Sequence, residues 1–405
     1  MRSFSELKNS KYMTLIMLYL GFCIAYIDRT AINFSLTAIG ADFHLSTSEL
    51  GVVMSAFFVG YTIMQLPGGV LADRFGSKKI ILISMSFWSL FTILTGTTYT
   101  LVGLLVIRFL FGIGEGSFPP ATFKGVAEAF PVNQRGKMAG VLASSNYVGS
   151  ALAPLIVVPI MLLTGGWRNM FHFLGIIGGV FILAYWLLVQ SKFSPGMTVA
   201  QRKSYNFRDV IHLSLLWKLL FAWFFLSVIN KGLASWMPAY LLTERGLDLK
   251  SVGLLMPLPF VAAGISTAIS GYVMEHYFNK REKYMLAGCA LLTAFFLYFM
   301  YTSTTIAEVM TFQCIVYFFK SFVLGIVMAL PLKLLPQTIA GSAVGLINLG
   351  GQAAGFIAPA AMGFIISAAG GNYNPVFIFL IISACLSALC SLSITNKDKK
   401  VEVNI

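Results

Sequence analysis

The chain has 405 residues, of which 58% are hydrophobic and only 11% are charged. A soluble domain carries about 25% charged residues, so this composition excludes an ordinary soluble protein and indicates an integral membrane protein. The formal net charge of +13 would suit a nucleic-acid partner, but the basic residues cluster in short segments between apolar stretches, which indicates loops beside a lipid bilayer instead.

Twelve apolar stretches predict twelve transmembrane helices. The first is not a cleavable signal peptide, because it contains charges and lacks a small-residue cleavage site. The polar and basic segment 191–212 separates two bundles, 1–190 and 213–395, and a tail, 396–405, follows them. The helices are expected near 12–36, 48–70, 79–98, 100–122, 137–163, 167–190, 213–241, 250–275, 283–303, 306–335, 339–369 and 374–395.

Lysine and arginine gather at both ends of the chain, in 191–212 and in the segments after helices 2, 4 and 8. The positive-inside rule therefore predicts that both termini and the linker are cytoplasmic. Six helices in each half then make the halves parallel repeats, and carriers of that design bind substrate between their halves near the middle of the membrane. We expect an all-α, multi-pass plasma-membrane protein that functions as a monomer.

Two charged residues, Asp28 and Arg29, stand side by side within the first helix. A charge at the centre of a bilayer costs about 2.5–3.5 kcal/mol on insertion scales, so such residues indicate a substrate or ion pathway. Glu115 is the other acid deep in a span, and Arg108 precedes it by two turns on the same helix face. A carboxyl group with a switchable arginine partner can gain and lose a proton. We therefore assign proton coupling to Asp28, Glu115 and Arg108.

The partners of these charges follow from depth along the helices. A rise of 1.5 Å per residue puts Asp28 and Arg108 within several ångströms of one level, so we expect them to pair. Adjacent helix residues point about 100° apart, so Arg29 is expected to face either the substrate or Glu115. Its expected role is to bind the substrate carboxylate as a bidentate pair. The alternative is that the four residues form a buried ion network that only fixes packing.

No cluster of residues suggests catalysis or metal binding. The five cysteines all fall in apolar stretches without metal-ligand spacing and are interpreted as small core residues. There is no Ser-His-Asp cluster, phosphate-binding loop or appended soluble domain. We expect a protein that is not an enzyme and that uses no metal or cofactor, with protons rather than sodium as the coupling ion.

The segment GVLADRFGSKK, residues 69–79, resembles the signature loop of the major facilitator superfamily. The segment GYVMEHYFNKRE, residues 271–282, repeats its order of glycine, acid and basic cluster in the second half. The resemblance implies a gating element rather than a substrate site, in which the acid pairs with cations or caps a helix. The gating residues are Gly69, Asp73, Arg74, Gly76 and Lys78.

Two further segments, AYIDRTAINFSL at 25–36 and RFLFGIGEGSFPPATF at 108–123, resemble the anion:cation symporter branch of that superfamily. This branch includes bacterial sugar-acid proton symporters and relatives of sialin and the vesicular glutamate transporters. The resemblance implies proton-coupled uptake of a small organic anion by alternating access, with a hexonate, hexarate or hexuronate as the expected substrate. Helix 5 lacks the Gly-Pro-rich repeat of proton-driven drug antiporters, which favours symport. Export or exchange of an organic anion or drug is the alternative, and a non-transporting membrane sensor is the alternative of another class.

The resemblance also implies substrate contacts in the first half. Polar or aromatic groups at the positions of Tyr26, Tyr61 and Asn146 hold substrate hydroxyls in the family. Many branch members carry glutamine where Asn146 stands, so the reach of this side chain differs here.

Four polar residues of the second half are also candidates for binding substrate. Asn348 and Gln352 lie one turn apart on helix 11. Lys231 and Lys320 have no deep acid in this half to balance them, so we expect them to attract the anion or, alternatively, to snorkel to an interface.

Overall fold

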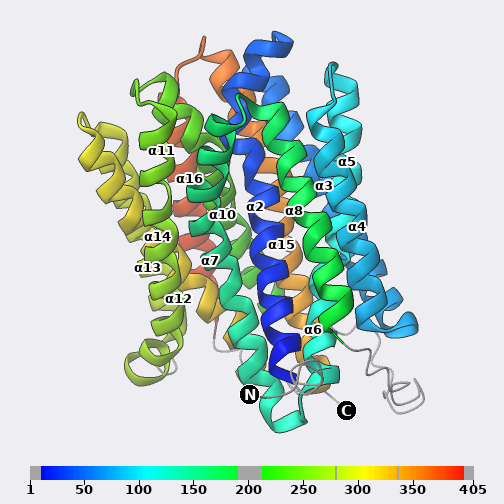
Figure 1. Cartoon of the computed structure of the whole chain (residues 1–405). Coiled ribbons are helices and arrows are strands. Elements are labelled where there is room, and N and C mark those ends of the chain that lie inside the picture. The colour runs from blue at the N-terminus through cyan, green and yellow to red at the C-terminus, as the bar shows by residue number, and fades with distance from the viewer. Residues whose placement is uncertain (1–10, 190–211, 279–280, 335–336, 396–405) are drawn as a thin grey trace. The chain divides into compact units, whose positions relative to one another are not determined.

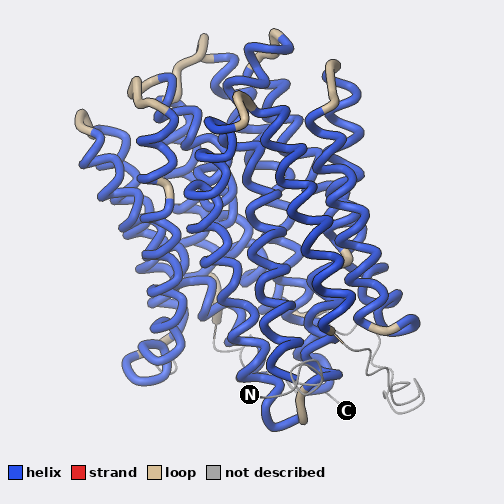
Figure 2. The backbone as a smooth tube through the Cα atoms, viewed as in Figure 1, coloured by secondary structure: helices blue, strands red, loops and turns tan. Residues whose placement is uncertain are grey.

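The computed structural model describes residues 11–189, 212–278, 281–334 and 337–395, and every regular element in these ranges is an α-helix (Figure 2). Twelve helical segments in the described part of the chain are long and apolar enough to cross a membrane. The predicted all-α protein with twelve membrane-spanning helices is therefore confirmed. The predicted tail and nearly all of the predicted linker lie outside the described residues, and the cytoplasmic placement of the termini stays a prediction.

The first half of the chain forms six of the spans. One of them, Leu101–Ala129, consists of two helices that are interrupted at Ser117. Pro119 and Pro120 follow the interruption, and a proline has no backbone N–H with which to continue the helical hydrogen bonds. The helices are α2 (Lys11–Phe43), α3 (Thr47–Phe75), α4 (Ser77–Gly96), α5 (Leu101–Gly116), α6 (Phe118–Ala129), α7 (Val132–Leu163) and α8 (Trp167–Leu188).

The second half forms the other six spans, and here too one span is interrupted. The span Leu249–Met274 breaks at Met256, directly before Pro257. The helices are α10 (Ser214–Thr243), α11 (Leu249–Leu255), α12 (Pro257–Tyr277), α13 (Glu282–Thr302), α14 (Ile306–Leu334), α15 (Gln337–Ala368) and α16 (Asn374–Leu392).

These helices belong to two compact units, Met1–Gln201 with Leu247–Pro257, and Arg202–Gly246 with Leu258–Ile405. The short helix α11 packs against α7 of the first unit, where Gly253 lies against Val158. The segment 247–257 therefore lies with the first unit, although the division read from the sequence places it in the second bundle.

Within the first unit, α2 packs against α7, α3 against α5 and α4 against α8 (Figure 1). The backbones of α3 and α5 approach each other closely. A Cβ atom at Gly60 would overlap the carbonyl oxygen of Phe109, and one at Gly112 would overlap the carbonyl oxygen of Phe57. Small residues that bring two backbones together are a common basis for helix association in membranes.

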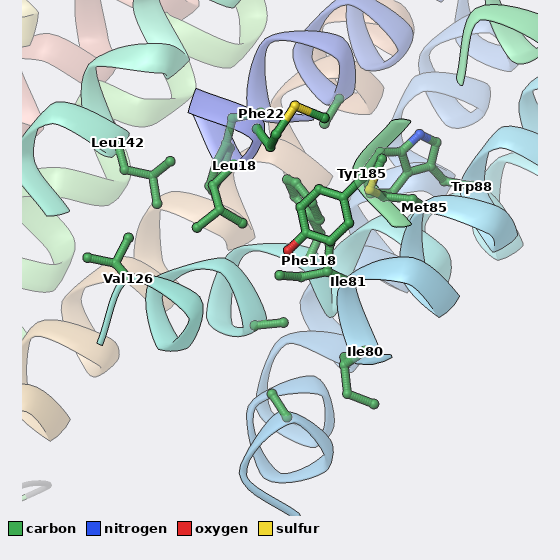
Figure 3. Close-up of a cluster of buried hydrophobic side chains, with 14 of the residues drawn as sticks. Leu18, Phe22, Ile80, Ile81, Met85, Trp88, Phe118, Val126, Leu142 and Tyr185 are labelled. Carbon is green, nitrogen blue, oxygen red and sulfur yellow. The ribbon is translucent and has the colours of Figure 1, made fainter. Parts of the chain in front are cut away.

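An aromatic and aliphatic cluster anchors α6 to its neighbours in the first unit (Figure 3). The ring of Phe118 lies edge-on to Phe22 of α2, at 5.1 Å, and to Trp88 of α4, at 4.8 Å between ring centroids. Tyr185 of α8 joins the same cluster and is almost fully buried. The cluster fixes α2, α4, α6 and α8 around the end of α5, where Glu115 lies.

Within the second unit, α10 packs against α15 and α16, and α13 packs against α14 and α16. Trp236 of α10 donates its indole N–H to the carbonyl oxygen of Pro359 on α15, at 3.0 Å. The Ser387 hydroxyl on α16 donates to the carbonyl oxygen of Ala222 on α10, at 2.8 Å. These side-chain bonds hold α10 in the interior of its unit.

Candidate functional site

A buried ion pair joins α2 to α5. Arg29 contacts Glu115 through Nη2 and Oε1, and only 8% and 1% of these two residues is exposed. Of the two directions expected for Arg29, the structure shows the one towards Glu115. A buried pair of this kind gains little net stability, because removing both charges from water costs several kcal/mol for each ion.

Three aromatic rings surround the guanidinium group of Arg29. Its central carbon lies 4.7 Å from the ring centroid of Tyr26, 5.0 Å from that of Phe57 and 4.6 Å from that of Tyr61. Cation–π attraction of this kind is worth roughly 0.5–1 kcal/mol at exposed sites and more where water is excluded. The structure thus brings Tyr26 and Tyr61 to Arg29 from two helices, and their contact with substrate stays a prediction.

The close packing of α3 against α5 explains how these residues meet. A Cβ atom at Gly116 would lie 2.5 Å from the carbonyl oxygen of Tyr61, so only glycine allows this approach directly beside Glu115. Beyond it, the Ser117 hydroxyl donates to Ser84 of α4, at 3.0 Å. The end of α5 is therefore held on two sides.

Asp28 lies beside this pair but is not part of it. The residue is 1% exposed, and in the described part of the chain neither of its carboxylate oxygens has a hydrogen-bond partner. The neighbouring helix α4 presents Trp88 and Thr92 to it. The Trp88 indole nitrogen likewise has no partner at hydrogen-bond distance among the described residues, and the Thr92 hydroxyl donates to a backbone oxygen of its own helix. Asp28 is thus a buried acid with unmet hydrogen-bonding capacity.

The expected ion pair between Asp28 and Arg108 is wrong for this structure, since no such pair forms among the described residues. The Arg108 guanidinium instead lies over the rings of Phe111, at 4.9 Å, and Phe57, at 5.4 Å. It is near enough to Asp28 for an electrostatic interaction. The two residues therefore lie near one another, as the depth estimate expected, but no ion pair joins them among the described residues.

Asn146 lies apart from this group. It is half-buried on α7, and no hydrogen bond among the described residues joins it to Arg29. One turn further on, Gly149 faces Tyr26, with its missing Cβ 2.9 Å from that of the tyrosine. The predicted role of Asn146 in holding substrate hydroxyls stays a prediction.

In the second unit, Lys320 of α14 is 3% exposed, so it does not snorkel. Its ammonium group donates to Asn230 Oδ1 of α10, at 2.6 Å, and to the hydroxyl of Ser321, at 3.1 Å. It also lies 4.3 Å from the ring centroid of Tyr317. Lys231 is half-buried and interacts electrostatically with Lys320. The structure therefore pairs Lys320 with Asn230, which the sequence analysis did not single out.

On α15, Asn348 and Gln352 are both half-buried. The buried Oε1 atom of Gln352 has no hydrogen-bond partner among the described residues. Their role in binding substrate stays a prediction.

The predicted gating residues lie where α3 ends and α4 begins. Lys124 of α6 binds this junction: its ammonium group lies 3.2 Å from Asp73 and 3.8 Å from Glu128, and it donates to the carbonyl oxygen of Ala72 at 2.6 Å. Gly76 has a φ angle of +87°, which favours glycine and lets the chain turn from one helix into the next.

The remaining residues of this segment have separate neighbours. Lys78 donates to the carbonyl oxygen of Trp186 on α8, at 3.0 Å. Arg74 lies over the ring of Phe75. The missing Cβ of Gly69 would make an ordinary contact with Pro120, at 3.6 Å.

The sequence analysis assigned no role to Phe57, Asn230, Lys124 or Glu128. From sequence alone, a phenylalanine that packs inside the helix bundle, such as Phe57, cannot be distinguished from one that faces lipid. Lys124 was counted only among the basic residues that predict the orientation of the chain in the membrane, although its spacing of four residues from Glu128 could have indicated a helical ion pair.

Among the described residues, no group of three or more histidine, cysteine or acidic residues could hold a metal ion.

Comparison with known proteins agrees with the fold. The family model described as Major Facilitator Superfamily matches residues 18–359. The chain is 28% identical to the hexuronate transporter of Bacillus subtilis (strain 168), over 95% of this chain and 94% of that protein. It is 27% identical to the probable galactarate/D-glucarate transporter GarP of Escherichia coli (strain K12), over 98% of this chain and 97% of that protein.

A solved structure supports the same architecture. The crystal structure of a bacterial homologue of the human lysosomal transporter Spinster, in an inward-facing and occupied conformation, superimposes with a TM-score of 0.84. The match covers 95% of this chain and 97% of that one, at 19% sequence identity. At this identity the likeness concerns the fold alone.

Proposed function

Because the chain belongs to the major facilitator superfamily, we propose that it is a secondary transporter that takes up a sugar acid together with protons. Its family and fold are those of transporters and not of enzymes. The observation that carries the proposal is the buried pair of Arg29 and Glu115 within a ring of aromatic side chains. Such charges inside a membrane span mark substrate or ion pathways.

In the proposed cycle, Glu115 determines whether Arg29 can bind an anion. While Glu115 is ionised, it occupies the guanidinium group and its negative charge repels an incoming carboxylate. When Glu115 takes up a proton, this attraction is lost, and Arg29 is able to bind the substrate carboxylate with two parallel N–H bonds. Binding of the anion then requires a proton, which is the essential property of a symporter.

Asp28 and Arg108 form the second part of the proposed coupling. Burying a carboxylate without a hydrogen-bond partner is costly, so Asp28 is suited to exchange a proton with the transport pathway. Arg108 lies near enough to respond to the charge of Asp28. Sodium is the alternative coupling ion. It would bind to oxygen ligands of the protein, whereas a proton is taken up by an acid that titrates.

The substrate class rests on chemistry and on the relatives. The hexuronate and galactarate/D-glucarate transporters are named for acids that carry carboxylates and several hydroxyl groups. Arg29 suits the carboxylate, while Tyr26 and Tyr61 beside it have hydroxyl groups that can bind those of a sugar. We propose uptake across the plasma membrane, with both termini in the cytoplasm.

The α3–α4 junction is the proposed gate. Lys124 connects the acids Asp73 and Glu128 to a backbone oxygen. Its partner Asp73 is exposed, and ion pairs with an exposed member are weak enough to break during a conformational cycle. The gate thus depends on contacts that change, whereas the Arg29–Glu115 site lies in the buried interior.

Reconstituted liposomes test the proposal. An inward proton gradient should drive accumulation of labelled D-glucuronate or D-glucarate, and a sodium gradient alone should not. Glu115→Gln and Asp28→Asn should each abolish accumulation driven by protons. If both variants accumulate substrate as well as the wild type does, the coupling roles are wrong. If an outward gradient is needed instead, the protein is an exporter or exchanger.

A further inference from the structure

In the first unit, a buried hydrogen-bond donor without an acceptor lies beside the buried acid without a donor. Trp88 of α4 is 0% exposed, and its indole nitrogen has no partner at hydrogen-bond distance among the described residues. The same is true of both carboxylate oxygens of Asp28, which Trp88 faces. An indole nitrogen only donates hydrogen bonds, whereas an ionised carboxylate only accepts them. Each group therefore offers what the other lacks.

The packing of α4 against α5 fixes the indole in this place. A Cβ atom at Gly114 would lie 3.0 Å from the backbone nitrogen of Trp88, so the two helices touch at the residue directly before Glu115. The ring of Phe118 lies edge-on to the indole, at 4.8 Å between ring centroids (Figure 3). A donor that is held by packing is preorganised, because it needs no large rearrangement to meet a charge that develops beside it.

Thr92 places a second donor on the same face of α4, four residues after Trp88. Its buried hydroxyl donates to the carbonyl oxygen of Trp88, at 3.0 Å, and its oxygen is able to accept a hydrogen bond from a protonated Asp28. Once the proton has left Asp28 for the transport pathway, rotation of the hydroxyl directs its hydrogen to the carboxylate. The Trp88 carbonyl then keeps the helical hydrogen bond from the backbone of Thr92.

These two donors are neutral, unlike the other groups that act on Asp28. Glu115 and Arg108 of α5 interact with it electrostatically. Further titratable groups on the helices packed against α2 face other residues: Tyr61 of α3, Lys124 of α6, Tyr147 of α7 and His172 of α8. A hydrogen bond from a neutral donor favours the ionised carboxylate without adding a charge that must itself be balanced.

We propose that Trp88 is a positioning residue for proton coupling, whose indole N–H donates to Asp28 whenever that residue is ionised, with the Thr92 hydroxyl as the second donor. The inference rests on the proposed function, in which Asp28 exchanges a proton with the transport pathway. The two donors hold the ionised side chain in place while the empty protein returns, and so they favour release of the proton. They act through Asp28 and not on the substrate.

Two modes of transport in liposomes separate proton release from substrate binding. Net uptake of labelled D-glucuronate requires the protein to release its proton inside and to return empty, whereas exchange of internal for external D-glucuronate at equal pH omits that return. Trp88→Phe keeps an aromatic ring beside Phe118 and removes the donor. It should lower net uptake at neutral interior pH about tenfold, the factor that corresponds to one pKa unit, and leave most of the exchange activity.

The pH profile gives a second readout, which a role in packing alone would not change. With the exterior pH held constant, the interior pH that gives half-maximal uptake should rise in Trp88→Phe by about one unit, because a hydrogen bond to a charged group has roughly the free energy of one to two pKa units. The rise follows because the ionised carboxylate has lost a donor, so release of the proton needs a more alkaline interior.

Matched variants show whether the donors act through Asp28. Thr92→Val keeps the shape without the hydroxyl and should shift the pH profile in the same direction, while Thr92→Ser keeps the hydroxyl and should not; this pair decides the question if Trp88→Phe fails to fold. Trp186→Phe makes the same replacement at an exposed tryptophan of α8 and should change neither mode. In the Asp28→Asn background, Trp88→Phe should have no further effect on exchange, because the carboxylate on which it acts is absent.

The outcomes distinguish this inference from the proposed function. Equal losses of uptake and exchange with an unshifted pH profile would show that Trp88 and Thr92 serve packing alone and would overturn the inference, as would unchanged uptake in Trp88→Phe and Thr92→Val. Either result leaves the proposed function standing. A wild type that exchanges D-glucuronate but does not accumulate it under an inward proton gradient would overturn the proposed proton coupling, and the inference with it.

Discussion

The buried pair of Arg29 and Glu115 makes a prediction that separates stability from function. In Glu115→Met the guanidinium group of Arg29 loses its countercharge but stays in the interior, where 8% of the residue is exposed. The double variant Arg29→Met/Glu115→Met removes both charges and leaves apolar side chains of similar length. We expect the single variant to be the less stable of the two, although it carries fewer changes.

The magnitude follows from the burial of both groups. Removing one partner of a buried pair costs about 3–5 kcal/mol, because the other charge remains without compensation. The rings of Tyr26, Phe57 and Tyr61 still stabilise the cation, so we expect the low end of that range, about 3 kcal/mol. Replacing both members by apolar residues is often neutral or stabilising, so the double variant should unfold within about 1 kcal/mol of the wild type.

Denaturant titration of the purified variants in detergent, followed by tryptophan fluorescence, gives these differences. Transport in liposomes should be lost in both variants, because each lacks a group on which coupling depends. A double variant as unstable as Glu115→Met would refute the reasoning, since the instability would then come from packing and not from an uncompensated charge. A double variant that still transports would show that the pair has no role in the cycle.

Two further predictions concern helix contacts. Gly112→Ala should lower the free energy of unfolding by about 1–3 kcal/mol, because its new Cβ overlaps the carbonyl oxygen of Phe57, whereas Gly179→Ala, which meets nothing within 4 Å, should have no such effect in the same denaturant titration. Asp248 caps α11 by accepting the backbone N–H of Ser251, and hydrogen bonding from the Ser251 hydroxyl and from this N–H lowers the pKa of the carboxyl group. The cap therefore stabilises the helix above the pKa of the unfolded chain and weakens as pH falls through the lower folded-state pKa. The protection factors of the α11 amides, which correct for the slower intrinsic exchange at acid pH, should therefore fall with acidification in the wild type but not in Asp248→Asn. Equal exchange profiles in the two proteins would contradict this assignment.

The fold was predictable from sequence because lipid imposes simple rules. Each span must be apolar over about 20 residues, so the twelve helices are visible in composition alone. The interruptions at Ser117 and Met256 were not among the expectations from sequence, which had unbroken helices near 100–122 and 250–275, although the prolines behind them explain both breaks. The spacing of Gly112 and Gly116, four residues apart, also indicates the close helix contact that the structure shows.

The pairing of the charges was less predictable. Which cation meets which acid depends on helix registration and on the reach of long side chains, so nearness of Asp28 to Arg108 did not produce an ion pair between them. Arg29 therefore meets Glu115, and Asp28 has no hydrogen-bond partner in the part of the chain that the structure describes. The part played by Phe57 between two guanidinium groups had no sequence signal, because only the packing of α3 against α5 places its ring there.

Proton uptake on substrate binding tests the central claim most directly. The purified protein in weakly buffered detergent solution, with a pH indicator dye, is mixed with a sugar acid adjusted to the same pH. The account predicts that the wild type takes up protons as the anion binds, and that Glu115→Gln binds the anion with a clearly smaller uptake, because Arg29 is already free in that variant. Binding by the wild type without proton uptake, or an unchanged uptake in Glu115→Gln, would contradict the claim that protonation of Glu115 releases Arg29 for the substrate.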